Sequence, residues 1–173
     1  MNLPYRVVCT GPESCGKTVL AQQLAAHFNC PWVPEYARIF LETLDRPYEL
    51  NDLKDIAKGQ EALEAEYAAQ AKDLLLCDTD LLTILVWGEY KFGYRDPQIE
   101  SQFVRSGTGL YLLCLPDLPW QDDPMREHPE ERGPLLKLYE GHLIRNGKAY
   151  VRIGGIGERR KEAAIKAILM TQK

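Results

Sequence analysis

The sequence contains no apolar run long enough to span a membrane and no block rich in lysine and arginine. Residues 1–6 also lack the long apolar region of a signal peptide. The formal net charge is −4. Because of this charge and these absences, we expect neither a membrane nor a nucleic acid as a partner. We expect a soluble, cytoplasmic protein whose partner is a small molecule, and formation of a homo-oligomer stays open.

Cysteine is too scarce and too scattered for a disulfide framework or a zinc site, since the five residues are odd in number and form no C-x-x-C pair. Cys9, Cys77 and Cys114 lie in apolar runs, where a thiol packs as a small hydrophobic group. Cys15 is different, because it lies next to Lys17 at the predicted start of a helix. Positive charge there is expected to lower the pKa of its thiol.

Five short apolar runs alternate with segments of helical periodicity, which predicts an α/β fold with a five-stranded parallel sheet. The expected strands are 6–10, 31–34, 74–77, 110–115 and 149–153. Helices are expected after the first strand and over 53–71, 81–90, 97–105, 135–144 and 158–169. Residues 1–173 are the size of a single domain, with helices flanking both faces of the sheet.

A phosphate-binding pattern, G-x-x-x-x-G-K-[ST], follows the first predicted strand. It reads Gly11-Pro12-Glu13-Ser14-Cys15-Gly16-Lys17-Thr18. Backbone N–H groups of such a loop bind phosphates, Lys17 supplies charge to the β and γ oxygens, and the Thr18 hydroxyl can bind Mg²⁺. We therefore predict a P-loop NTPase fold that binds ATP, or GTP, with Mg²⁺. The expected nucleotide-binding residues are Gly11, Glu13, Ser14, Cys15, Gly16, Lys17, Thr18 and Val19.

Polar residues follow the other strands, where ligands gather in an open parallel sheet. Asp78 comes directly after an apolar strand, as in a Walker B element, which indicates a metal ligand or a catalytic base. A helix cap is the alternative for this carboxylate. Asp80 could equally cap the next helix or bind a substrate hydroxyl.

Glu35 and Arg38 follow the second strand with the spacing of one helix face. A structural ion pair is one interpretation. In phosphoryl transfer to an alcohol, however, a carboxylate accepts or orients the hydroxyl proton and an arginine offsets phosphate charge. Glu35 and Asp78 are both candidates for the base, and the sequence does not separate them.

The segment 116–134, which we call the lid segment, contains five prolines and many charges, so it cannot form one helix. Its place after the fourth strand favours a mobile lid over an inert loop. Arg126 and Arg132 are its candidate phosphate ligands and catalytic residues. Five carboxylates nevertheless outnumber these two arginines between residues 120 and 132, which would suit a cationic acceptor. Tyr36 and Trp120 could stack on such an acceptor, or pack in the core.

Taken together, these motifs resemble the ribosylnicotinamide kinase (NadR-type) domains, a family of P-loop proteins related to nucleoside kinases. The resemblance covers almost the whole length. It lies in the phosphate loop, Glu35-Tyr36-Ala37-Arg38, Gly59-Gln60, Asp78-Thr79-Asp80 and Pro119-Trp120 with the arginine-bearing lid segment.

This resemblance implies that the γ-phosphate of ATP is transferred to the 5′-hydroxyl of nicotinamide riboside, giving nicotinamide mononucleotide for NAD synthesis. Its acceptor would carry a cationic pyridinium ring. Members of the family often carry a nucleotidyltransferase domain, which we do not expect here. Two alternatives stay open: a kinase for another nucleoside or small alcohol, and a P-loop ATPase or regulatory module that acts through a protein partner.

Overall fold

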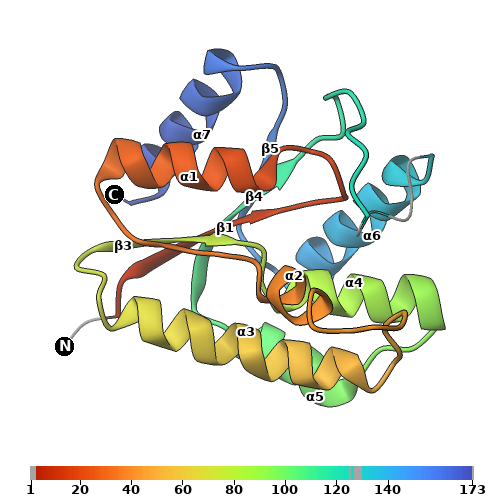
Figure 1. Ribbon diagram of the computed structural model, residues 1–173. Helices are drawn as coiled ribbons and strands as arrows, with labels where there is room; N and C mark the ends of the chain where they lie inside the picture. Colours follow the sequence, from red (N-terminus) through yellow and green to blue (C-terminus); the bar gives the residue numbers. More distant parts are fainter. Residues whose placement is uncertain (1–2, 125, 127–129, 173) are drawn as a thin grey trace.

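The computed structural model describes residues 3–124, 126 and 130–172 of the chain. Five strands form one fully parallel sheet in the order β2-β3-β1-β4-β5 (Figure 1). The strands are β1 (Tyr5–Thr10), β2 (Trp32–Val33), β3 (Leu74–Asp78), β4 (Thr108–Cys114) and β5 (Tyr150–Ile153). The phosphate loop follows the central strand, so the strands on either side of β1 carry the neighbouring parts of the site.

Helices cover both faces of the sheet, as expected for a doubly wound fold (Figure 1). They are α1 (Lys17–Phe28), α2 (Tyr36–Leu41), α3 (Asp52–Ala68), α4 (Leu81–Phe92), α5 (Pro97–Arg105), α6 (Arg132–Arg145) and α7 (Glu158–Thr171). Helices α1 and α7 pack on one face, and α3 to α6 lie on the other. The predicted five-stranded parallel P-loop fold is confirmed.

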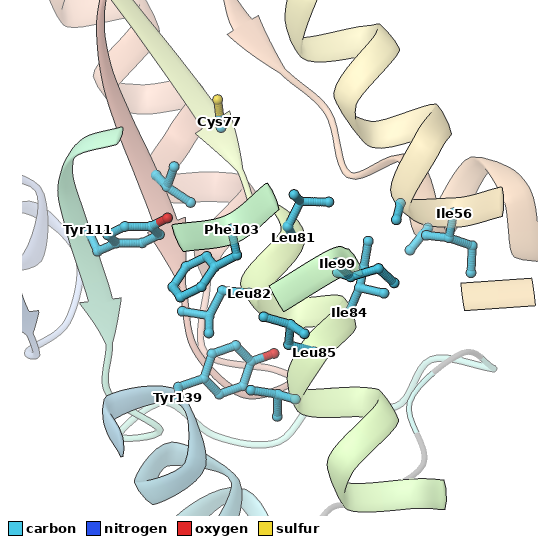
Figure 2. Close-up of a cluster of buried hydrophobic side chains, with 14 of the residues drawn as sticks. Ile56, Cys77, Leu81, Leu82, Ile84, Leu85, Ile99, Phe103, Tyr111 and Tyr139 are labelled. Carbon is cyan, nitrogen blue, oxygen red and sulfur yellow. The ribbon is translucent and has the colours of Figure 1, made fainter. Parts of the chain in front are cut away.

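Successive strand residues alternate between two hydrophobic cores because both faces of the sheet are covered. Val7 and Cys9 join the core under α1 and α7, whereas Val8 joins the larger core under α3 to α6. Figure 2 shows the larger core, where Phe103 of α5 packs against Tyr111 of β4 with ring centroids 6.1 Å apart. The carboxyl ends of the strands are thereby held at one rim.

The lid segment differs from its predicted bounds at one end. Its described residues up to 131 contain no helix or strand, but α6 already begins at Arg132. Glu131 occupies the N-cap position, and the helix continues through Pro134 because a proline is tolerated in the first turn. Met125 and residues 127–129 of the predicted lid lie outside the described residues. None of the described helices is long and apolar enough to cross a membrane.

Candidate functional site

The phosphate loop joins β1 to α1 and needs both of its glycines. Gly11 has φ +132° and Gly16 has φ +75°, a region that side chains rarely adopt. A Cβ on Gly11 would lie 2.7 Å from the carbonyl oxygen of Cys114. The loop can therefore lie tightly against the end of β4 only because residue 11 has no side chain.

Two side chains of the loop, Lys17 and Cys15, fold back onto its backbone. Lys17 Nζ donates to the carbonyl oxygen of Pro12 at 2.7 Å, and the Cys15 thiol donates to the same oxygen at 2.8 Å. Burial opposes the charge of Lys17, but the surrounding thiol, phenol and carboxyl groups outweigh it and raise its pKa. The lysine therefore stays protonated and available to a phosphate.

Cys15 has the lowered pKa that the sequence predicts. Burial raises the pKa of its thiol, but a hydrogen bond with Cys114 and the charges of Lys17 and Arg160 outweigh this effect and lower it to about 6. The thiol is fully buried under the loop. Its charge therefore depends on contacts inside the site rather than on solvent.

Thr18 and Asp78 form the second part of the site. Thr18 Oγ1 donates to Asp78 Oδ2 at 2.5 Å, while Asp78 Oδ1 is buried without a hydrogen-bond partner in the part of the chain that the structure describes. Burial raises the pKa of Asp78, and the bond from Thr18 and the charge of Lys17 lower it. A hydroxyl beside an unsatisfied carboxylate oxygen fits Mg²⁺, which takes oxygen ligands and keeps several waters.

A cavity of about 390 Å³ extends from the phosphate loop past Glu35 and Arg38 to α4. Besides the loop residues Glu13 to Val19, its lining includes Glu35, Arg38, Leu41, Thr83, Trp87 and Arg126. Burial and the nearby charge of Asp78 raise the pKa of Glu35 to about 7. Raised pKa values in a cleft are typical of functional carboxylates.

The lid segment contacts the site through its arginines. Arg126 lines the cavity and donates to the carbonyl oxygen of Gln121 at 2.5 Å. Arg132 instead donates to the carbonyl oxygens of Leu118, at 2.9 Å, and Ser14, at 3.3 Å, which ties α6 to the phosphate loop. Two further bonds cross to the lid segment: Arg38 pairs with Asp123 at 2.8 Å, and Gln121 N donates to Ser14 Oγ at 2.9 Å.

Three predicted substrate residues are not among the described residues that line this cavity. Asp80 caps α4 by accepting from Leu82 N at 3.0 Å, and it also accepts from the Tyr111 hydroxyl at 2.7 Å. Trp120 Nε1 donates to Asp122 at 2.9 Å, with its ring 5.7 Å from the Arg132 guanidinium.

The third of these residues, Tyr36, packs on α3. A Cβ on Gly59 would lie 1.9 Å from the Tyr36 ring, so the ring rests directly on the helix backbone. The Tyr36 N–H donates to Gln60 Oε1 at 3.0 Å, which fixes the start of α2. Gly59 and Gln60 therefore position α2, the helix that begins after Glu35 and carries Arg38.

The sequence reasoning missed Trp87 and Arg160, which both line the cavity. Trp87 lies one helical turn after Thr83 on α4, and this spacing behind the Asp78 strand end was the available signal. Arg160 is 5% exposed in the first turn of α7. Nothing in its local sequence distinguishes it from its exposed neighbour Arg159.

The fold and the phosphate loop define a P-loop nucleotide-binding protein. Residues 6–160 match the family model described as an AAA domain, and the chain belongs to this family. The ATP-dependent protease ATPase subunit HslU of Bradyrhizobium diazoefficiens is 27% identical over an alignment of 134 residues that covers 68% of this chain and 31% of that protein. The chain thus spans about a third of the length of this curated relative.

Solved structures share the fold over nearly the whole chain. NadR in complex with NR has a TM-score of 0.85 at 22% identity, over 98% of this chain and 52% of NadR. NadR with NAD and AMP-PNP has a TM-score of 0.82 at 21% identity, over 98% and 49%. Thymidylate kinase from Ehrlichia chaffeensis has a TM-score of 0.70 at 14% identity, over 96% and 100%. The predicted resemblance to NadR is confirmed in fold, which is also that of nucleoside and nucleotide kinases.

Proposed function

We propose that this protein is a nucleoside kinase that transfers the γ-phosphate of ATP to the 5′-hydroxyl of nicotinamide riboside. The observation that carries the proposal is one continuous cavity that joins the phosphate loop to Glu35, Arg38 and Trp87. A phosphate donor and an acceptor can lie end to end in such a space. The likeness to NadR in complex with NR supports this choice of acceptor.

The two candidate carboxylates have different surroundings, which supports a division of roles. Asp78 is buried and bonded to Thr18, the arrangement that suits a metal ligand. Glu35 lines the cavity, and its pKa of about 7 suits a group that accepts a hydroxyl proton near neutral pH. We therefore assign Glu35 as the base and Thr18 with Asp78 as the Mg²⁺ ligands.

The remaining polar groups would act on charge and orientation. Mg²⁺ held by Thr18 and Asp78 would neutralise charge on the phosphate oxygens. Lys17 and Arg126 line the cavity and would stabilise the transferring phosphoryl group. Arg38, whose guanidinium is paired with Asp123, would keep the lid segment close to the acceptor.

Trp87 of α4 lines the cavity and would stack its ring on the acceptor. A pyridinium ring is cationic, so a tryptophan face and the carboxylates Glu13 and Glu35 would all attract it. This position gives Trp87 the stacking role that the sequence suggested for Tyr36 and Trp120. The acidic residues of the lid segment would add to the same attraction.

The experiment that tests the proposal is a mass-spectrometric assay with Mg-ATP and a panel of nucleosides that includes nicotinamide riboside. We expect nicotinamide riboside to gain the mass of one phosphate group. Phosphorylation of a different nucleoside alone would contradict the acceptor but keep the reaction. Release of ADP without any phosphorylated acceptor would contradict the kinase and favour an ATPase or switch module.

A further inference from the structure

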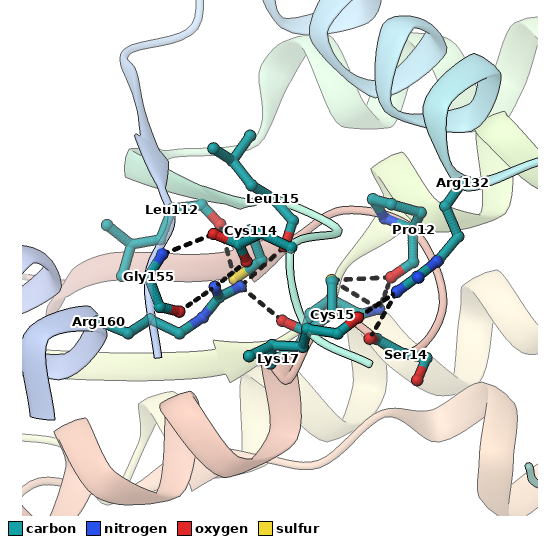
Figure 3. A network of polar contacts seen from close by, with 12 residues as sticks. Pro12, Ser14, Cys15, Lys17, Leu112, Cys114, Leu115, Arg132, Gly155 and Arg160 are labelled. Carbon is teal, nitrogen blue, oxygen red and sulfur yellow. Dashed lines mark hydrogen bonds and ion pairs between the residues drawn. The ribbon is translucent and has the colours of Figure 1, made fainter. Parts of the chain in front are cut away.

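Arg160 donates four hydrogen bonds to the loops around the cavity. Its Nη2 donates to the carbonyl oxygens of Cys15, at 2.6 Å, and Leu115, at 3.1 Å. Its Nη1 donates to Asp117 Oδ1 at 2.7 Å and to the carbonyl oxygen of Gly155 at 3.0 Å (Figure 3). The guanidinium is almost fully buried.

These four acceptors belong to three different loops. Cys15 lies in the phosphate loop, Leu115 and Asp117 lie in the loop that follows β4, and Gly155 lies between β5 and α7. Asp117 Oδ2 also accepts from Gly155 N at 2.6 Å, so the same carboxylate joins two of the loops. Arg160 and Asp117 therefore hold together the loops that follow β1, β4 and β5.

The bond to Cys15 has a direct consequence for phosphate binding. The described chain contains no cis peptide bond, so the Cys15 carbonyl and the Gly16 N–H point in opposite directions within their shared peptide plane. A guanidinium that holds this carbonyl on the side of α7 turns the Gly16 N–H the other way. Gly16 lines the cavity and has φ +75°, so no side chain of its own fixes this peptide.

We propose that Arg160 is a positioning residue, which aims the Gly16 N–H at the nucleotide phosphates by holding the Cys15 carbonyl. A preset N–H donor binds phosphate without reorganisation, which is the general advantage of such loops. Lysine could not replace it, because a single ammonium group cannot reproduce the planar fork that reaches three loops. The inference rests on the proposed nucleotide site but not on the identity of the acceptor.

The test compares Arg160→Lys with the matched control Arg159→Lys, whose parent side chain is the exposed neighbour. Binding of Mg-ADP and of AMP is measured by calorimetry, since only ADP carries the β-phosphate that the loop would hold. We expect Arg160→Lys to weaken the binding of ADP roughly tenfold, in line with the loss of a hydrogen bond to a charged group. AMP binding should change less than twofold, and Arg159→Lys should bind both nucleotides like the wild type.

If Arg160 has a purely structural role, Arg160→Lys will lower the unfolding temperature and weaken the binding of ADP and AMP equally. That result would overturn the proposal. Asp117→Asn provides a second variant that removes the ion pair but keeps the buried arginine, so it tests the same point if Arg160→Lys does not fold. We expect a smaller loss that is again confined to ADP, and an unchanged ratio of ADP to AMP affinity would overturn the proposal. A wild type that binds ADP but does not phosphorylate nicotinamide riboside would contradict only the proposed acceptor.

Discussion

The phosphate loop and the lid segment are held in place by different kinds of contact. The loop is fixed by buried groups: Gly11 against the backbone of β4, the Cys15 carbonyl on Arg160, and Thr18 on Asp78. The lid segment is held largely at the surface, where Trp120 bonds to Asp122 and Arg126 bonds to the carbonyl oxygen of Gln121. Solvent weakens exposed polar contacts, so the phosphate loop is preset while the lid segment can adjust.

The largest effect is expected from a substitution in the phosphate loop. Lys17→Ala removes the one ammonium group of the loop, so we expect turnover to fall by roughly 10³-fold or more, with loss of ADP binding. Steady-state kinetics and calorimetry check both effects. Lys58→Ala, at an exposed position of α3, is the control and should behave like the wild type. Turnover within a few fold of the wild type would contradict the role of Lys17.

The next effect tests the base through its pH dependence. Since the pKa of Glu35 is raised to about 7, its carboxyl is largely protonated, and unable to accept a proton, below that pH. We expect kcat/KM to fall about tenfold per pH unit below 7 and to level off above it. Glu35→Gln should lower kcat by about 10²-fold or more and abolish this limb of the profile. Glu66→Gln, on the exposed face of α3, should keep the limb.

An intermediate effect is expected from a substitution in the lid segment. Arg126 reaches the cavity from the lid segment, and a lid arginine acts mostly on the charge of the transition state. We expect Arg126→Ala to lower kcat by roughly tenfold or more and to leave the KM for ATP nearly unchanged. Separate titrations of ATP and of the acceptor measure the two constants. A change confined to KM would instead indicate plain ground-state binding.

The smallest effect sharpens the assignment of the acceptor end. Trp87→Leu keeps the volume apolar but removes the aromatic face, so we expect the KM for nicotinamide riboside to rise by roughly five- to tenfold. The KM for ATP should stay the same, because Trp87 belongs to α4 and not to the phosphate loop. Trp120→Leu is the comparison variant. A larger acceptor effect for Trp120 than for Trp87 would show that stacking takes place in the lid segment.

The phosphate loop and Trp87 also differed in how well the sequence predicted their place in the site. The phosphate loop and Asp78 were predictable because glycine, lysine and a carboxylate after a strand are tied to position by local geometry. The five strands were predictable because strands buried on both faces read as continuous apolar runs. Trp87 was not, since its place in the cavity depends on how α4 packs beside α2 and the phosphate loop.

Arg160 and Asp80 show that the local sequence does not decide which side chains enter the site. Arg160 reads as one of two adjacent surface arginines, yet the packing of α7 buries it beneath the phosphate loop. For Asp80 the sequence left a helix cap and a substrate ligand equally open, and the structure shows the cap, because Thr79 turns the chain with φ +67° and Asp80 accepts from α4. Which of two neighbouring residues points into a site is decided by tertiary packing.

The contact between Gly59 and Tyr36 couples two positions that lie far apart in the sequence. Any side chain at position 59 would collide with the Tyr36 ring, so the two residues can change only as a pair. Because Glu35 directly precedes Tyr36, a replacement of Gly59 would shift the carboxylate that faces the cavity without touching any ligand. Replacing Gly59 with a larger residue would therefore lower turnover from outside the cavity. A smaller side chain at position 36 would restore it by making room for the new side chain.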